Sequence, residues 1–133
     1  LKQRRPDLLI ELNGGLETPE DCLVALDECD GAMVGRAAYA HPLRWADIDY
    51  LIYGEAPRQL LASDVVEGLI PHAALHLHRG GRLWDLCRHL VQLVEGVPGA
   101  RQWRRELGER SQHKGADLNI LIEAGRQLKD AGL

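Results

Sequence analysis

The two stretches Leu8-Leu9-Ile10-Glu11-Leu12-Asn13-Gly14-Gly15 and Gly31-Ala32-Met33-Val34-Gly35-Arg36-Ala37-Ala38-Tyr39 decide the fold of this chain. Each contains a short apolar strand that stops abruptly in glycine. A strand that ends in glycine lets backbone N–H groups approach a ligand with no Cβ in the way. Between them, Thr18-Pro19-Glu20-Asp21 predicts a helix start, with a threonine cap, an early proline and acids in the first turn. We therefore expect a β–α–β unit with parallel strands.

The two glycine endings predict a phosphate site. In a (β/α)₈ barrel, the loops after the last two strands often build a phosphate-binding corner. Arg36 follows Gly35 directly and offers a fixed positive charge with a planar donor fork. Either ending alone is best explained as a tight turn, but the two together favour a phosphate-like ligand. His41 lies near the same rim, and its sequence context fits a bond to a ligand or to backbone equally well.

The predicted fold class is α/β followed by all-α. A two-stranded parallel sheet cannot cover its own faces and edges. We therefore expect residues 1–53 to be the last two βα units of a (β/α)₈ TIM barrel, rather than a domain that closes by oligomerising. Residues 54–62 are expected to be a linker. Residues 63–133 show four amphipathic helical patterns with short connections, which predict an up-and-down four-helix bundle.

Within residues 63–133, three local features are specific enough to test. Ser63-Asp64 predicts the cap of the first helix, and Pro71 inside its pattern predicts a kink or a division. The apolar pattern of the second helix runs from Leu83 to Val94, with Gly96 as its cap. Asp117 predicts the cap of the last helix.

Composition is ordinary, but charge is segregated. The chain has 133 residues, a net charge of −4 and 45% apolar residues, typical of a soluble globular protein. Residues 79–114 carry eight basic and four acidic residues, whereas the rest carries eight basic and sixteen acidic residues. Such segregation can direct a polyanion to one face, and the alternative is a solvated helical surface. No membrane span or signal peptide is apparent. Because Cys22, Cys29 and Cys87 form no C-x-x-C motif, we expect reduced thiols in a cytoplasmic protein.

Arg101, Arg104 and Arg105 are the basic cluster that most resembles a binding surface. Their spacing of i, i+3 and i+4 places them on one helix face, while Trp103 should point into the bundle. An arginine group of this kind suits a nucleic-acid backbone. A solvated arginine face explains the same pattern equally well.

Three histidines also have a suggestive spacing. His72 and His76 stand at i and i+4, as paired helical metal ligands do, and His78 is close by. No glutamate or cysteine nearby completes a set of ligands, so we expect no metal site and assign these histidines no role.

Several runs together resemble one known family. Asn13-Gly14-Gly15, residues 33–39, Arg88-His89-Leu90, residues 98–105 and residues 113–117 are similar, in this order, to the C-terminal part of a bacterial tRNA-dihydrouridine synthase of the A type. The resemblance covers most of the chain. The runs 98–105 and 113–117 are specific to that subfamily, whereas the glycine motifs are shared with other FMN-dependent barrels.

The resemblance implies an FMN-carrying barrel followed by a helical domain that binds tRNA. Such enzymes reduce uridines of the D loop to dihydrouridine with hydride that NADPH first gives to FMN. Carried over, the resemblance places Asn13, Gly14 and Gly15 after strand seven and Gly35 and Arg36 after strand eight, at the FMN phosphate. It also implies that Arg101 and Arg104 contact tRNA.

The chain departs from the family pattern in two places. The Asn-x-Gly-Cys-Pro motif that carries the family's catalytic cysteine is absent, so the resemblance assigns no catalytic residue to this chain. Ala40-His41 replaces the usual Gln-Asn before the proline. Two alternatives stay open: a stand-alone tRNA- or RNA-binding helical module without activity, and a phosphate-binding half-barrel of another flavoenzyme. The arginine cluster argues against the second.

Overall fold

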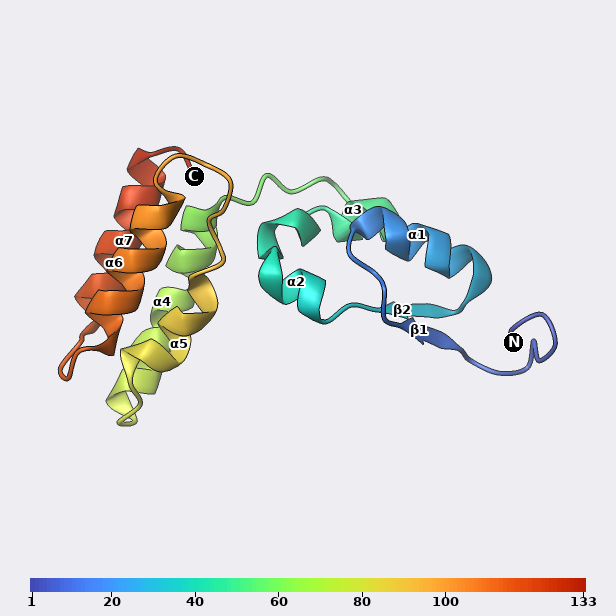
Figure 1. Ribbon diagram of the computed structural model, residues 1–133, viewed down its shortest axis with the longest axis horizontal. Helices are drawn as coiled ribbons and strands as arrows, with labels where there is room; N and C mark the ends of the chain where they lie inside the picture. The colour runs from blue at the N-terminus through green and yellow to red at the C-terminus, as the bar shows by residue number, and fades with distance from the viewer. The chain divides into compact units, whose positions relative to one another are not determined.

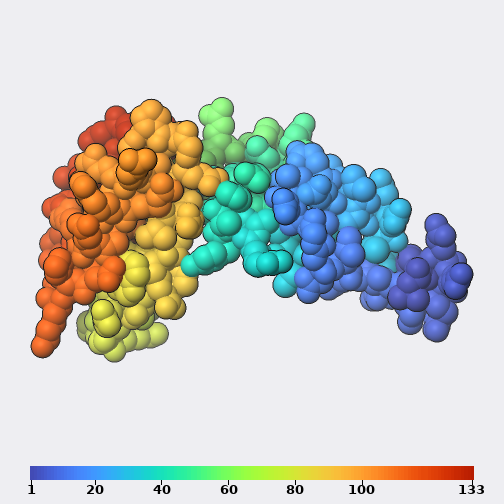
Figure 2. Space-filling model, viewed as in Figure 1, coloured from blue at the N-terminus to red at the C-terminus, as the bar shows by residue number.

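The computed structural model describes all 133 residues, and the chain divides into two compact units, Leu1–Gln59 and Leu60–Leu133. The first unit holds a small parallel sheet and short helices, and the second contains helices and no strand (Figure 1). Figure 2 gives the same view with all atoms space-filling, coloured by residue number as in Figure 1. No helix combines the length and the apolar character needed to cross a membrane.

The first unit is built on the predicted β–α–β element. Strand β1 (Glu11–Asn13) and strand β2 (Gly31–Met33) pair in parallel, with Leu12 opposite Ala32. Helix α1 (Pro19–Glu28) connects them and contacts β2. The strands are shorter than the apolar runs in the sequence, because each has a single partner and the pairing extends over three residues only.

The loop that leads from β1 into α1 is fixed by a capping box. Thr18 Oγ1 accepts a hydrogen bond from the N–H of Asp21 (3.2 Å), and Asp21 Oδ2 accepts one from the N–H of Thr18 (2.9 Å). The same carboxylate accepts a bond from the N–H of Glu17 (2.9 Å). These backbone bonds, from Glu17 and then Thr18, lower the pKa of Asp21. The reciprocal arrangement stabilises the helix start and orients the loop before it.

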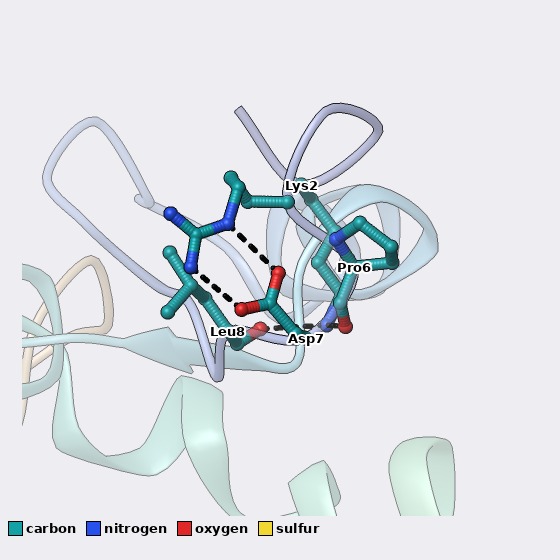
Figure 3. Close-up of polar contacts among 5 residues, drawn as sticks. Lys2, Pro6, Asp7 and Leu8 are labelled. Atoms are coloured by element: carbon teal, nitrogen blue, oxygen red, sulfur yellow. Dashed lines mark hydrogen bonds and ion pairs between the residues drawn. The ribbon is translucent and has the colours of Figure 1, made fainter.

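A lysine ties the N-terminal segment to the sheet. Lys2 Nζ donates to the carbonyls of Pro6 (3.2 Å) and Leu8 (2.8 Å), as Figure 3 shows. It also pairs with Asp30 Oδ2 at 2.7 Å. Asp30 Oδ2 also accepts from the N–H of Ile10 (2.9 Å), and the Lys2 and Ile10 bonds lower the pKa of this carboxyl. The entry to β1 and the turn before β2 are therefore joined through one carboxylate.

Three short helical segments follow β2. They are α2 (Arg36–Ala40), the 3₁₀ helix η1 (Pro42–Trp45) and α3 (Ile48–Tyr53). After Pro42 the chain thus forms two short helical segments, η1 and α3, separated by Ala46 and Asp47. Helix α3 contacts α1, and η1 contacts α2. Few side chains of this unit are buried, and Leu9 is 90% exposed.

The second unit consists of four helices that pack in a cycle. They are α4 (Ala62–His78), α5 (Leu83–Leu90), α6 (Ala100–Gln112) and α7 (Leu118–Asp130). Helix α4 contacts α5 and α7, and α6 contacts the same two helices. The core holds side chains that are at most 2% exposed, among them Val66, Leu83, Cys87, Leu107 and Leu121.

Two local predictions for this unit are wrong, the Ser63 cap and the extent of the second helix, and the division that Pro71 allowed in the first helix does not occur. Helix α4 begins at Ala62 with Leu61 as its N-cap, because Asp64 Oδ2 accepts from the N–H of Leu61 (2.9 Å), so buried Ser63 is no cap. Pro71 lies inside α4 without dividing it. Helix α5 ends at Leu90, and the apolar residues that follow it are buried in a non-helical segment, namely Leu93 and Val94.

Candidate phosphate and nucleic-acid sites

The loops that follow the two strands meet at a hollow of about 510 Å³ in the first unit. We call it the strand-end hollow. All five residues that the sequence singled out for a phosphate lie along it, together with others that include Glu17, His41 and Arg44. They meet because parallel strands end at the same edge of a sheet, so the loops after β1 and β2 are neighbours. The five are Asn13, Gly14, Gly15, Gly35 and Arg36.

The glycines of the strand-end hollow leave its wall open. Gly14 and Gly15 have φ angles of 119° and 73°, which side-chain-bearing residues rarely adopt. A Cβ built on Gly14, Gly15 or Gly35 would meet no heavy atom within 4 Å. Gly14 and Gly15 are therefore required by the backbone conformation rather than by crowding. The space beside all three remains free for a ligand to approach the main chain.

The strand-end hollow has a cationic lining. Arg36 and Arg44 are both exposed and form no ion pair with the chain's carboxylates, and Glu17 is the one acidic residue beside them. Two unpaired guanidinium groups offer planar donor forks that match a phosphate. The arrangement can attract and hold a small dianion.

Sequence reasoning missed Arg44. The 3₁₀ turn of η1 brings it back to the hollow, since side chains at i and i+3 lie in line in such a helix. The N–H of Arg44 donates to the carbonyl of His41 (3.1 Å), and both residues line the hollow. The available signal was the His-Pro-x-Arg spacing after Arg36, with Pro42 favouring a helical turn.

A second cationic surface lies on α6. Arg101, Arg104 and Arg105, which we call the arginine face, are exposed and form no ion pair. Arg110 on the same helix differs, because it pairs with Glu123 of α7 at 2.6 Å. The predicted inward direction of Trp103 is confirmed: this side chain is 7% exposed.

The histidines and cysteines form no reactive cluster. His76 Nε2 lies 3.2 Å from Asp85 Oδ2, while His72 and His78 are exposed. No group of three His, Cys, Asp or Glu side chains is placed to hold a metal ion. The three cysteines are free thiols, and burial raises the pKa of Cys87 to about 11.

A family model and individual relatives of known name both match the chain, and both indicate the same family. The sequence model of the family described as Dihydrouridine synthase (Dus) matches residues 1–129. A tRNA-dihydrouridine(20/20a) synthase of Escherichia coli (strain K12) is 38% identical over 130 residues, which are 98% of this chain and 38% of the relative. The tRNA-dihydrouridine(20/20a) synthase of Shewanella oneidensis is 38% identical over 121 residues, which are 91% of this chain and 36% of the relative. The chain thus spans less than two fifths of the length of these relatives.

Proposed function

Because the chain belongs to the dihydrouridine synthase family, we propose that it is the C-terminal part of a flavin-dependent tRNA-dihydrouridine synthase. The parent enzyme reduces uridine in the tRNA D loop to 5,6-dihydrouridine with FMN and NADPH, in the cytoplasm. In this proposal residues 1–53 complete a TIM barrel, residues 54–62 link it to the next domain, and residues 63–133 bind tRNA. The observation that carries the proposal is the meeting of two glycine-ended strands and two unpaired arginines at one hollow, in a chain of this family.

The residues of the strand-end hollow fit the phosphate of FMN. Open main chain at the glycines and two guanidinium groups suit a dianion. When bound, FMN supplies the hydride chemistry. The role of this chain is to hold the phosphate end: Arg36 donates its planar fork, Arg44 adds charge, and Asn13 with the glycine backbone shapes the loop around the ligand.

Removing the Arg36 side chain tests the cofactor assignment. In the full-length protein, Arg36→Ala should lose about 1.5–3 kcal/mol of FMN affinity, as expected for a charge-assisted bond to phosphate. Fluorescence titration would register this as a roughly 10- to 150-fold rise in Kd. Arg101→Ala removes the same charge from α6 and should leave FMN affinity unchanged. An unaltered Kd in Arg36→Ala would remove this residue from the site.

The arginine face supports the tRNA assignment. Arg101 and Arg104 are free to pair with backbone phosphates, and each pairing releases condensed counterions from the RNA. Arg101→Ala and Arg104→Ala should each cost on the order of 1–2 kcal/mol of tRNA affinity and flatten the salt dependence by about one unit or less. Filter binding across a salt series measures both. If both variants bind tRNA with wild-type affinity at every salt concentration, the arginine face does not contact tRNA and is only a solvated surface.

The chain lacks the motif to which the family resemblance assigns the proton-transfer step. Protonation of the uracil carbon needs a general acid, and the motif that carries the family's cysteine is absent here. Cys22 and Cys87 are buried, and no cysteine lines the strand-end hollow. We expect no dihydrouridine when the 133-residue chain is incubated with FMN, NADPH and unmodified tRNA. Product above background would place the acid within this chain.

A stand-alone tRNA-binding module is the second candidate. The observation in its favour is that the arginine face lies on a unit with its own core, residues 60–133. The genomic sequence before the Leu1 codon separates the candidates, because the synthase requires an in-frame Asn-x-Gly-Cys-Pro motif there.

A further inference from the structure

A second hollow, of about 450 Å³, lies within the helical unit. We call it the loop-end hollow. One wall is the connection between α4 and α5, at Gly81, Arg82 and Leu83, and the other is the end of α6 with its following loop, residues 111–116. The two connections lie at the same end of the four helices in Figure 1. Nothing in the proposed function uses these residues.

The lining of the loop-end hollow carries positive charge and no acid. Arg82 and Lys114 are exposed and form no ion pair, and His113 stands beside Lys114. Two carboxylates follow the lining closely in the sequence, and both are hydrogen-bonded. Asp85 Oδ2 accepts from the backbone N–H of Arg82 (3.0 Å) and lies 3.2 Å from His76 Nε2, and Asp117 Oδ1 accepts from the N–H of Asn119 (3.0 Å). The hollow therefore offers cationic donors to an anion, and no acidic side chain in its lining competes for them.

The walls of the loop-end hollow are held in place by packing. The imidazole of His76 occupies the space in which a Cβ on Gly81 would stand, so the turn after α4 sits directly against this ring. On the opposite wall, Ser111 is 2% exposed and its Oγ donates to the carbonyl of Leu107 (2.6 Å). Two connections distant in the sequence thus form one preorganised cationic site.

We propose that the loop-end hollow binds a backbone phosphate of RNA through Arg82 and Lys114, as a contact separate from the arginine face. The inference rests on the proposed tRNA-binding function. Gln112, at the hollow, is about 12 Å along α6 from Arg104, at 1.5 Å per residue. In duplex DNA each strand carries one charge per roughly 3.4 Å of helix axis, and at a similar spacing in RNA about four nucleotides span the two contacts. Helix α6 would then lie along the strand and contact it near both helix ends.

Charge removal at the loop-end hollow tests the inference in the 133-residue chain. Arg82→Ala and Lys114→Ala should each weaken binding of an unmodified tRNA transcript by about 3- to 10-fold at low salt and flatten the salt slope by about one unit or less. Lys114→Arg should retain most of the affinity. Lys129→Ala, near the other end of α7, removes one charge from the surface and should change binding by less than twofold. Thermal melts check that each variant is folded.

Chemical protection gives a readout independent of affinity. The amine of Lys114 should become resistant to acetylation by an N-hydroxysuccinimide ester when tRNA is added, and Lys129 should not. Inorganic phosphate at the same phosphate concentration should protect Lys114 far less. Equal protection by inorganic phosphate would assign the hollow to a free anion and overturn the RNA assignment.

The outcomes separate this inference from the proposed function. If Arg101→Ala weakens tRNA binding while Arg82→Ala and Lys114→Ala bind as wild type, the loop-end contact is wrong and the arginine face stands. If all three variants bind as wild type, both assignments fail. Loss of affinity in all three, with Lys114 protected by tRNA, supports two contacts along α6.

Discussion

At the residue scale, two tryptophans place their indole N–H groups in opposite situations. Trp103 Nε1 donates to the carbonyl of Leu90 at 3.1 Å, whereas Trp45 Nε1 is buried without a partner. Removing one member of a buried hydrogen bond leaves the other member unsatisfied, which costs more than removing a donor that has no partner. The same substitution at the two sites therefore separates the bond from the loss of aromatic volume.

Trp103→Phe should lower the free energy of unfolding by about 1–3 kcal/mol more than Trp45→Phe, because it leaves the Leu90 carbonyl without its donor. Calorimetric melts of the two variants and the wild type give the comparison. An equal or larger loss in Trp45→Phe would mean that its indole N–H has a partner in solution.

The cysteines differ in how well the fold shields them. Cys87 is fully buried, and burial raises its pKa to about 11, while Cys29 is partly exposed. Since the thiolate is the reacting species, iodoacetamide at pH 8 should modify Cys29 first and Cys87 only after unfolding in guanidinium. Peptide mass spectrometry over time measures both. Modification of the two at similar rates in the folded chain would contradict the packing of α5.

At the element scale, the sequence predicted those helix ends that are set by hydrogen bonds between residues close in the chain. Thr18 and Asp117 were predicted as caps, and their side chains accept from the N–H of Asp21 and Asn119. The predicted Ser63 cap was wrong, because the side chain of the neighbouring Asp64 accepts the hydrogen bond from the N–H of Leu61 at the helix start. The predicted end of α5 was also wrong. The spacing of apolar residues indicates which side chains are buried but not the backbone conformation, and Val94 is buried outside any helix.

Of the two hollows, one could be predicted from the sequence and the other could not. The meeting of Asn13-Gly14-Gly15 with Gly35-Arg36 was predictable, because parallel strands bring their ends to one edge. That Arg82 and Lys114 line the same hollow was not predictable from the sequence, because it depends on which helix connections lie together in the packed unit. No local pattern in the sequence carries that information.

Two helix glycines provide a matched test of packing. A Cβ on Gly125 of α7 would lie 2.9 Å from Val66 Cγ1 of α4, whereas a Cβ on Gly108 of α6 would meet nothing within 4 Å. Gly108→Ala should stabilise the chain by up to about 1 kcal/mol through helix propensity. Gly125→Ala gains the same propensity but overpacks the interface, so we expect a net loss of roughly 1–2 kcal/mol. Denaturant unfolding measures both, and the reverse order would show that α4 and α7 are less closely packed.

At the scale of the whole molecule, the two units have unequal cores. All the buried apolar residues except Pro19, Cys22 and Ala25 belong to the second unit. In the first unit, Leu9, Leu12 and Met33 on and beside the strands are exposed. Under the proposed function these side chains face the preceding strands of the barrel. The helical unit, by contrast, buries its apolar faces among its own four helices, and its stability is expected to be the greater.

The segment between the units is where proteolysis should show this difference. Residues 54–61 are exposed and lie outside helices and strands. Arg58 is held by one hydrogen bond from its N–H to Asp47 Oδ1 (3.1 Å) and by a 3.9 Å contact of its guanidinium with Glu55. Apart from the basic N-terminal residues, trypsin should therefore cut first at Arg58, since cleavage needs an accessible, flexible backbone. Arg101 and Arg104 are exposed but sit in α6, whose backbone must unfold before it is cut. Mass spectrometry of a digestion series should find a persistent product that begins at Gln59, while the N-terminal product disappears. Arg58→Gln should delay that cut, and early cleavage at Arg101 or Arg104 would mean that the helical unit does not hold itself together.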